Sequence, residues 1–330
     1  MTSATIKTGP AVKPVAPGKP VLVVAGPTAS GKSALAMDLA QAFDGVIINA
    51  DSMQVYKELR VLTARPSAAD EDRVTHRLYG IMPASEPCSV AHWREMAVQQ
   101  VTEAHAVGRV PVVTGGTGMY IRALMQGLAA IPTVPPAVRQ AVQVLYDEEG
   151  GGAALQALAD VDAETASRLA PGDRQRVIRA LEVHRATGQS LSHWLAAGNQ
   201  GTLDDVSFQA VVLHPPRDTL YRKIDDRFVE MLKQGGMQEV EALLAKELDP
   251  ALPAMKAVGV RELAAYFAGE TSRDDAVAGA QQASRNYAKR QSTWFRNQIP
   301  EGKSIFAQYS ESQKEEIFSF VRQFVLTHPF

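Results

Sequence analysis

The chain has 330 residues, 45% of them hydrophobic, one cysteine and a formal net charge of -2. This length and composition suit a globular protein with one large α/β domain and a smaller one, whereas the lone Cys88 excludes an internal disulfide framework and a cysteine-based zinc cluster. No apolar stretch approaches the roughly 18 residues of a membrane span, so we expect a cytoplasmic protein without membrane contact, with a disordered tail over residues 1–19. Because the net charge is near zero, any contact with nucleic acid must come from local basic patches.

The first part of the chain alternates strand-like and helical patterns, as a parallel sheet requires. The patterns predict strands over 21–25, 46–50, 110–114 and 208–213, and helices over 32–42, 90–107, 118–126 and 217–246. Strand signals vanish from about 132 to 200, where the pattern is helical and Gly150–Gly152 is expected to be a loop. Helices should continue to about 298, followed by a peripheral strand and helix.

The motif at residues 26–33, GPTASGKS, is typical of a phosphate-binding loop between a strand and a helix. Its glycines let backbone amides turn toward a phosphate, Lys32 reaches the terminal phosphates, and Ser33 offers a hydroxyl to Mg²⁺. The helix N-terminus adds partial positive charge. The residues expected to bind a di- or triphosphate are Gly26, Pro27, Thr28, Ala29, Ser30, Gly31, Lys32 and Ser33.

These patterns together predict an α/β fold with a P-loop NTPase-like parallel sheet and an inserted all-helical lobe. The core is expected over 20–131 and 202–330, with its C-terminal helices, and the insertion over 132–201. Asp51 ends the second predicted strand, at the sheet edge where ligands bind in parallel α/β folds. Its carboxylate could act on a substrate, cap a loop or help to organise Mg²⁺, and position alone does not separate these roles.

The third predicted strand ends in small residues, Gly115-Gly116-Thr117-Gly118. An NTPase that hydrolyses its nucleotide commonly has an acidic residue at the end of such a strand. A tight turn would explain the glycines, but we interpret this segment as a second wall of the ligand site, which bulky groups can approach closely.

Two basic patches follow. Residues 168–185 carry five arginines against Asp173 and Glu182, and residues 284–296 carry four cations and no acid. Phosphate neutralisation is one use of such patches, and a solvated helix face with local ion pairs is the other.

Five motifs in order resemble the tRNA dimethylallyltransferase family over roughly residues 20 to 300. They are GPTASGKS at 26–33, DSMQVY at 51–56, GGTGMY at 115–120, DRQRVIRALEV at 173–183 and SRNYAKRQSTWFR at 284–296. The chain departs from the usual pattern at Arg65, Thr75, Arg77 and Val260, where the family commonly has lysine, proline, a second histidine and tyrosine; His76 matches the first histidine of that pattern.

The resemblance implies a bacterial-type enzyme, expected to be a monomer. It would transfer a dimethylallyl group from dimethylallyl diphosphate to N6 of the adenosine 3′-adjacent to the anticodon, in tRNAs that read codons beginning with U, and release diphosphate. Lys32, the loop amides and Mg²⁺ at Ser33 would stabilise the departing diphosphate, and Asp51 would accept the N6 proton. Thr117 is the third residue that the resemblance makes catalytic.

The resemblance also assigns residues to the two substrates. Those expected to contact tRNA are Asp51, Ser52, Met53, Gln54, Thr117, Arg139, Gln175, Arg176, Val177, Ile178, Arg179, Lys289, Arg290 and Arg296. A basic residue is expected to close over the diphosphate, with Arg217, Lys223 and Arg227 as the candidates. The helical insertion would supply part of the tRNA contact.

Three other functions remain open at this point. An adenylate isopentenyltransferase would share the loop but would not require the helical lobe or two basic patches. A small-molecule or nucleotide kinase would share the loop and a lid-like insertion. An RNA-binding protein with a vestigial loop would be expected to lack Lys32 or Asp51, and both are present.

Overall fold

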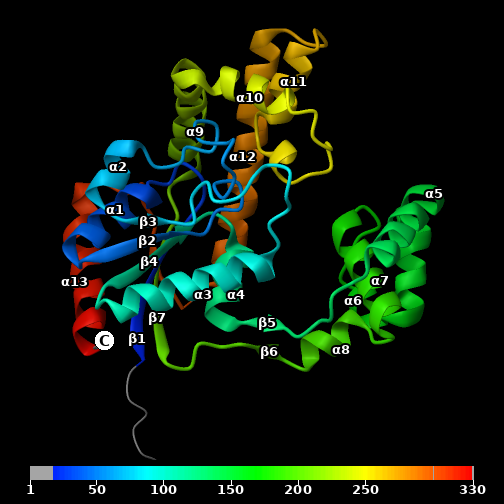
Figure 1. The fold of residues 1–330 in the computed structure, drawn as a ribbon, viewed down its shortest axis with the longest axis horizontal. Coiled ribbons are helices and arrows are strands. Elements are labelled where there is room, and N and C mark those ends of the chain that lie inside the picture. The colour runs from blue at the N-terminus through cyan, green and yellow to red at the C-terminus, as the bar shows by residue number, and fades with distance from the viewer. Residues whose placement is uncertain (1–17, 300, 329–330) are drawn as a thin grey trace, which may run out of the picture. The chain divides into compact units, whose positions relative to one another are not determined.

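The computed structural model describes residues 18–299 and 301–328, so most of the predicted disordered tail lies outside the described residues. Two compact units emerge from the contacts within the chain (Figure 1). The first combines the chain up to Leu124 with the chain from Asp204 onward, and the second is Met125–Leu203.

A six-stranded parallel sheet, in the order β3-β2-β4-β1-β7-β8, forms the centre of the first unit. Its strands are β1 (Lys19–Ala25), β2 (Gly45–Asn49), β3 (His76–Arg77), β4 (Val110–Gly115), β7 (Val206–Leu213) and β8 (Lys303–Ile305). Strand β1 pairs with β4 and β7, with Leu22 opposite Val112 and Gln209. Almost every residue of β1, β2 and β4 is buried, which explains their continuous apolar runs. The predicted parallel α/β core is confirmed.

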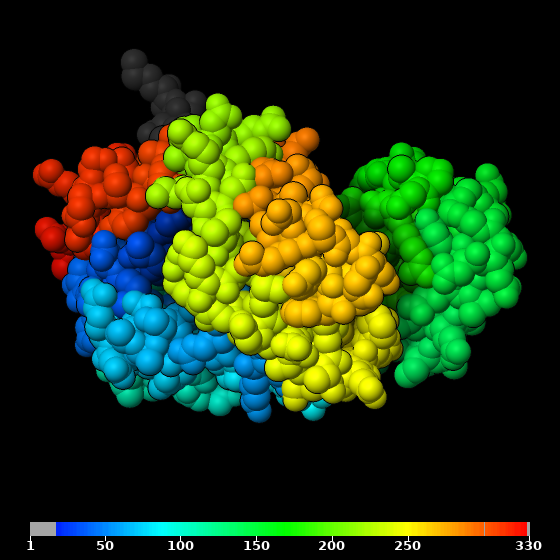
Figure 2. Space-filling model, turned by 90° about the horizontal axis from the view of Figure 1, so that it is seen from above, coloured from blue at the N-terminus to red at the C-terminus, as the bar shows by residue number. Residues whose placement is uncertain are grey.

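Helices cover this sheet and extend beyond the carboxyl ends of its strands. They are α1 (Lys32–Ala42), α2 (Ala68–Arg73), α3 (Val90–Ala106), α4 (Gly118–Gln126), α9 (Arg217–Met231), α10 (Met237–Leu244), α11 (Val260–Phe267), α12 (Arg273–Gln298) and α13 (Glu311–Thr327), with the short turns η1 (Leu232–Gly236) and η2 (Ala254–Lys256). Figure 2 shows the segment that carries α9 to α12, from yellow-green to orange, beside the light-blue loops that follow β2. Among the described residues, no helix combines the length and apolarity that crossing a membrane requires.

The predicted continuous helix over 217–246 is interrupted. It divides into α9 and α10 at the π-helical turn η1, where Gly235 has a positive φ of 100° that ends the regular pattern. The last thirty residues are less peripheral than expected. Strand β8 pairs with β7, and α13 contributes Ile317 and Val321 to the main core cluster.

The second unit contains α5 (Pro136–Val161), α6 (Ala163–Ala166), α7 (Arg174–Thr187) and α8 (Leu191–Ala196), with the paired short strands β5 (Leu128–Ala129) and β6 (Asn199–Gln200). Its core includes Val142 and Leu158 of α5 and Val177 of α7. The prediction of a loop at Gly150–Gly152 is wrong, because helical structure continues on both sides of a kink at Gly150, whose φ of 81° only glycine adopts readily.

Candidate active site

The phosphate-binding loop leads directly from β1 into α1. Gly31 has a φ of 90°, and a Cβ there would lie 3.0 Å from the Cβ of Tyr309, so glycine meets both a conformational and a steric requirement. Ala29 also has a positive φ, 61°, which is unusual for a residue with a side chain. The strained loop therefore depends on its neighbours to keep its shape.

Lys32 lies at the start of α1, and its Nζ donates a hydrogen bond to the carbonyl of Pro27 at 3.3 Å. Burial lowers the pKa of Lys32 to about 8, against the opposing effect of the Asp51 carboxylate and with a small further contribution from Arg227. Because the Lys32 ammonium has lost part of its hydration, it interacts strongly with an anionic ligand such as a phosphate.

Asp51 follows the carboxyl end of β2, and Asn49 fixes its backbone. The Asn49 side chain accepts a hydrogen bond from the Asp51 amide at 2.8 Å and donates to the Asp51 carbonyl at 3.0 Å. Asp51 Oδ1 accepts from the amide of Met53 at 3.0 Å, so the carboxylate also closes a local turn. Asp51 therefore caps its own loop, and its side chain also lines the pocket described below.

Thr117 ties the turn after β4 to the loop after β2. Its Oγ1 accepts a hydrogen bond from the amide of Ser52 at 2.9 Å and donates to Ser52 Oγ at 3.1 Å. A Cβ on Gly115 would come within 2.1 Å of the Ala50 backbone, so only glycine permits this approach of the two segments. The small residues at the end of β4 thus serve close packing beside Asp51.

Arg227, on α9, is the candidate cation that the fold brings to this site. Burial lowers the pKa of Arg227 and the Asp51 carboxylate opposes that effect, which places both charges in one environment. Arg217 instead stacks over the ring of Tyr221, 5.0 Å from its centroid, in a separate pocket, and Lys223 is exposed. The sequence does not distinguish the three cations, because they alternate with acids along one helical stretch.

A pocket joins these groups to an apolar wall. The residues that line it are Thr28, Ala29, Asp51, Met53, Leu62, Thr63, Ile224, Arg227, Phe228, Met231, Ala257, Val258, Ser284 and Tyr287. Polar groups from the phosphate loop, the loop after β2 and α9 therefore share one cavity with apolar side chains of α9 and the loop before α11. Such a cavity fits a ligand with a charged end and a short hydrocarbon end.

Helix α12 supplies two residues that sequence reasoning did not assign to the site. Tyr287 lines the pocket, and burial, together with the Asp51 charge, raises the pKa of its phenol. Gln291 is 5% exposed and hydrogen-bonds to two different loops. No local sequence pattern marks Gln291, because its burial depends on how α12 packs against these two loops.

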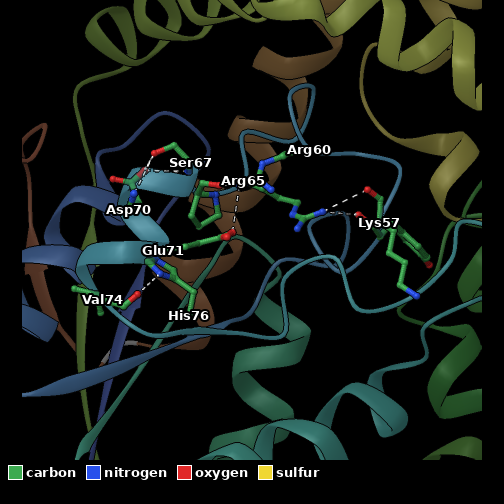
Figure 3. Close-up of polar contacts among 10 residues, drawn as sticks. Lys57, Arg60, Arg65, Ser67, Asp70, Glu71, Val74 and His76 are labelled. Carbon is green, nitrogen blue, oxygen red and sulfur yellow. Dashed lines mark hydrogen bonds and ion pairs between the residues drawn. The ribbon is translucent and has the colours of Figure 1, made fainter.

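The loop after Asp51 is held by residues from distant elements. Glu239 of α10 accepts hydrogen bonds from the backbone amides of residues 60, 61 and 62 at 2.7 to 2.8 Å. Arg65 donates to the carbonyl of Lys57 at 3.4 Å, and Figure 3 shows its side chain extended toward that residue. The guanidinium also leaves no room for a side chain on Gly80, since a Cβ there would lie 2.1 Å away. Arg65 therefore helps to hold the backbone of the loop after Asp51.

The predicted tRNA residues are distributed over both units. In the helical unit, Arg176 pairs with Asp173 at 3.3 Å, and Arg139 and Arg179 approach the buried Glu182 at 3.8 and 3.9 Å. In the first unit, Lys289 and Arg296 line the pocket that contains Arg217, and Arg290 lies over the Tyr287 ring.

Val177 and Ile178 lie in the core of the helical unit, with exposed fractions of 0% and 6%. Their side chains support the exposed neighbours Gln175, Arg176 and Arg179. Direct contact of these two side chains with RNA would require the core to open.

Ser33 is compatible with Mg²⁺ that arrives with a diphosphate. It is exposed at the first turn of α1, and the described residues include no cluster of three or more His, Cys, Asp or Glu that could hold a metal alone. Mg²⁺ often binds through few protein groups together with substrate phosphates, so a hydroxyl beside the phosphate loop fits that pattern.

Comparison with known proteins gives consistent matches. The model of the family described as IPP transferase matches residues 54–298. A tRNA dimethylallyltransferase of Rhodospirillum centenum is 55% identical over 85% of this chain and 90% of its own length. One of Azorhizobium caulinodans is 51% identical, over 88% and 92%.

Solved structures agree in fold. The tRNA isopentenylpyrophosphate transferase of Bacillus halodurans has a TM-score of 0.67 at 31% identity and covers 93% of this chain and 97% of its own. A eukaryotic dimethylallyltransferase acting on tRNA has a TM-score of 0.81 at 24% identity, over 94% of this chain and 81% of its own, which supports the fold alone. The family match and these identities over nearly the whole chain show that the protein belongs to the IPP transferase family.

Proposed function

We propose that this protein transfers the dimethylallyl group of dimethylallyl diphosphate to N6 of the adenosine 3′-adjacent to the anticodon of tRNA. The observation that carries the proposal is the gathering of Asp51, Arg227 and the phosphate loop around one pocket with an apolar wall. The charged side matches a diphosphate and the aliphatic side matches a five-carbon allylic group. Family membership supports the same reaction.

The diphosphate binds at the phosphate-binding loop, in contact with Lys32 and Arg227. As the bond between the allylic carbon and the diphosphate oxygen breaks, negative charge grows on that oxygen, and these partly buried cations stabilise it more strongly than fully exposed ones would. Mg²⁺ bound to the diphosphate and to Ser33 would supply further charge neutralisation.

The apolar wall, with Leu62, Ile224 and Phe228, orients the dimethylallyl group. The N6 amine of adenine forms the new bond to the allylic carbon, and Asp51 accepts the proton that N6 loses. An exocyclic adenine amine is a weak nucleophile, so alignment by the pocket and a positioned base must both contribute to the rate. Diphosphate leaves with the electron pair of the broken bond.

The tRNA is held in part by exposed arginines of α7, including Arg176 and Arg179, and by basic residues of α12, including Lys289 and Arg296. Such contacts supply binding to phosphates with little base specificity. The substrate implies a cytoplasmic location, and we propose a monomeric enzyme, which sedimentation or size-exclusion measurements would test.

The test of the proposed function is a choice of acceptor. We would incubate the protein with Mg²⁺, radiolabelled dimethylallyl diphosphate and unmodified bulk tRNA, with AMP and ATP in parallel reactions. Label in tRNA alone is the expected result. Label in AMP would assign the chain to adenylate prenylation, and phosphate loss from ATP without prenyl transfer would indicate a kinase.

A further inference from the structure

Gln291, on α12, joins the phosphate-binding loop to the turn after β4. Its Oε1 accepts a hydrogen bond from the backbone amide of Thr28 at 2.8 Å, and its Nε2 donates to the carbonyl of Gly116 at 2.8 Å. Because the first partner can only donate and the second can only accept, these partners determine the orientation of the side-chain amide. One buried side chain therefore fixes two loops that are far apart in the sequence.

Both ends of this bridge lie at tightly constrained positions. Thr28 precedes Ala29, the residue with a left-handed backbone, and Gln308 secures the other side of Ala29 by donating to its carbonyl at 3.1 Å. At Gly116, a Cβ would lie 2.2 Å from Gln291 Nε2 and 3.3 Å from Asp51 Oδ2. The glutamine, the glycine and the carboxylate are thus packed without spare room.

Each loop belongs to a different half of the proposed site. The Thr28 peptide is part of the loop that would bind the diphosphate, whereas Gly116 precedes Thr117, which contacts the loop after Asp51 through Ser52. A shift of the phosphate-binding loop can therefore be transmitted through the side chain of Gln291 to the turn at Gly116, which lies beside Asp51.

We propose that Gln291 is a positioning residue that couples diphosphate binding to the placement of the acceptor adenosine. This inference rests on the proposed function. Diphosphate that orders the Thr28 peptide also fixes Gln291, and through Gly116 it fixes the turn beside Asp51. The coupling is reciprocal, because bound tRNA must favour diphosphate by the same factor by which diphosphate favours tRNA.

The experiment measures the Kd of unmodified tRNA with and without inorganic diphosphate and Mg²⁺, together with kcat and Tm. Gln291→Met removes both hydrogen bonds at similar volume. The coupling factor is the Kd of tRNA without diphosphate divided by the Kd with it. We expect this factor to be about tenfold or more in the wild type and to fall toward one in the variant. The value of kcat at saturating substrates should fall about tenfold.

Three further variants separate coupling from general destabilisation. Gln291→Glu can still accept from Thr28 but, when ionised, cannot donate to Gly116, so it should also lose coupling. Gln308→Met should weaken diphosphate binding and leave the coupling factor intact, because the contacts of Gln308 with the Ala29 carbonyl and beside Gly31 both lie in the phosphate-binding loop. Gln282→Met, at an exposed position of the same helix where the glutamine bonds to its α12 neighbours Arg285 and Asn286, should change neither.

Wild-type coupling retained in both Gln291 variants would overturn the inference while the proposed function stands. Loss of coupling in Gln308→Met as strong as in Gln291→Met would also overturn it, because general loosening of the loop would then suffice. A wild-type protein that binds no diphosphate would overturn the proposed function and the inference with it.

Discussion

The two compact units hold their cations in different environments. In the sheet unit, Lys32 and Arg227 are partly buried, which lowers the pKa of both basic groups, and the carboxylate of Asp51 opposes that effect at both. In the helical unit, Arg174 and Arg176 are largely exposed and paired with surface carboxylates at 2.7 and 3.3 Å. Buried charges act on a nearby ligand with little screening, whereas exposed charges act weakly and in a salt-dependent way.

This difference predicts that the sheet unit controls diphosphate binding and the transfer step, and that the helical unit contributes to tRNA binding. Changes at the buried charges should alter the rate of transfer or the binding of diphosphate. Changes at the exposed arginines should alter tRNA affinity and its dependence on salt, with the chemical step unchanged.

The largest effect is expected for Asp51→Asn. Removing the proton acceptor should lower the single-turnover rate of transfer by about 10²- to 10⁴-fold, with the Kd values of tRNA and diphosphate changed little. Asp218→Asn, at an exposed position in the first turn of α9, is the matched control and should retain the wild-type rate. A rate for Asp51→Asn within threefold of wild type would leave the carboxylate with its loop-capping role alone.

Arg227→Met should have the next largest effect. Loss of this partly buried cation from the diphosphate site should lower transfer by about 10²- to 10³-fold and weaken binding of inorganic diphosphate in calorimetry. Lys223→Met removes an exposed cation from the same helix and should have little effect. Equal losses in the two variants would contradict the choice of Arg227.

The binding of diphosphate should depend on the protonation of Lys32. Burial favours the neutral amine, so the charge in the free protein is lost as the pH rises through about 8. A bound diphosphate favours the charged form, and its affinity should therefore fall by up to about tenfold per pH unit above that value.

Lys32→Arg provides the comparison, because arginine stays charged over this range and the ligand's own titration is the same in both measurements. The diphosphate affinity of the wild type divided by that of Lys32→Arg should fall from pH 7.5 to pH 9.5, a range that includes the Lys32 pKa of about 8. A constant ratio would show that Lys32 does not lose its proton there.

The smallest effects are expected for Arg176→Ala and Arg179→Ala. Each should weaken tRNA binding by severalfold and reduce the slope of log Kd against log salt by about one, because one phosphate contact is lost. The rate at saturating tRNA should stay at the wild-type value. A large drop in that rate would show that the helical unit also takes part in the chemical step.

The sequence predicted the part of the site that depends on local patterns. Residues 26–33 have the spacing of a phosphate loop, and the helix expected over 32–42 has those bounds in the structure. Asp51 was placed correctly at the carboxyl end of a strand because the apolar run before it is unambiguous.

What could not be predicted depends on packing between distant segments. Arg217, Lys223 and Arg227 are equivalent as sequence signals, and only the position of α9 in the fold buries the third. Gln291 contacts loops far away in the chain, so no local pattern reveals its partners. The kink at Gly150 could not be predicted either, because a run of glycines is compatible with both a loop and a kinked helix.

The most direct test is a structure of the protein with Mg²⁺, an unreactive thiolo analogue of dimethylallyl diphosphate and an anticodon stem-loop. We predict that Lys32 and Arg227 contact the diphosphate, that the allylic group lies against the wall containing Phe228, and that adenine N6 lies within hydrogen-bonding distance of Asp51. A diphosphate in the other pocket, lined by Arg217, Lys289 and Arg296, or an adenine remote from Asp51, would contradict the account.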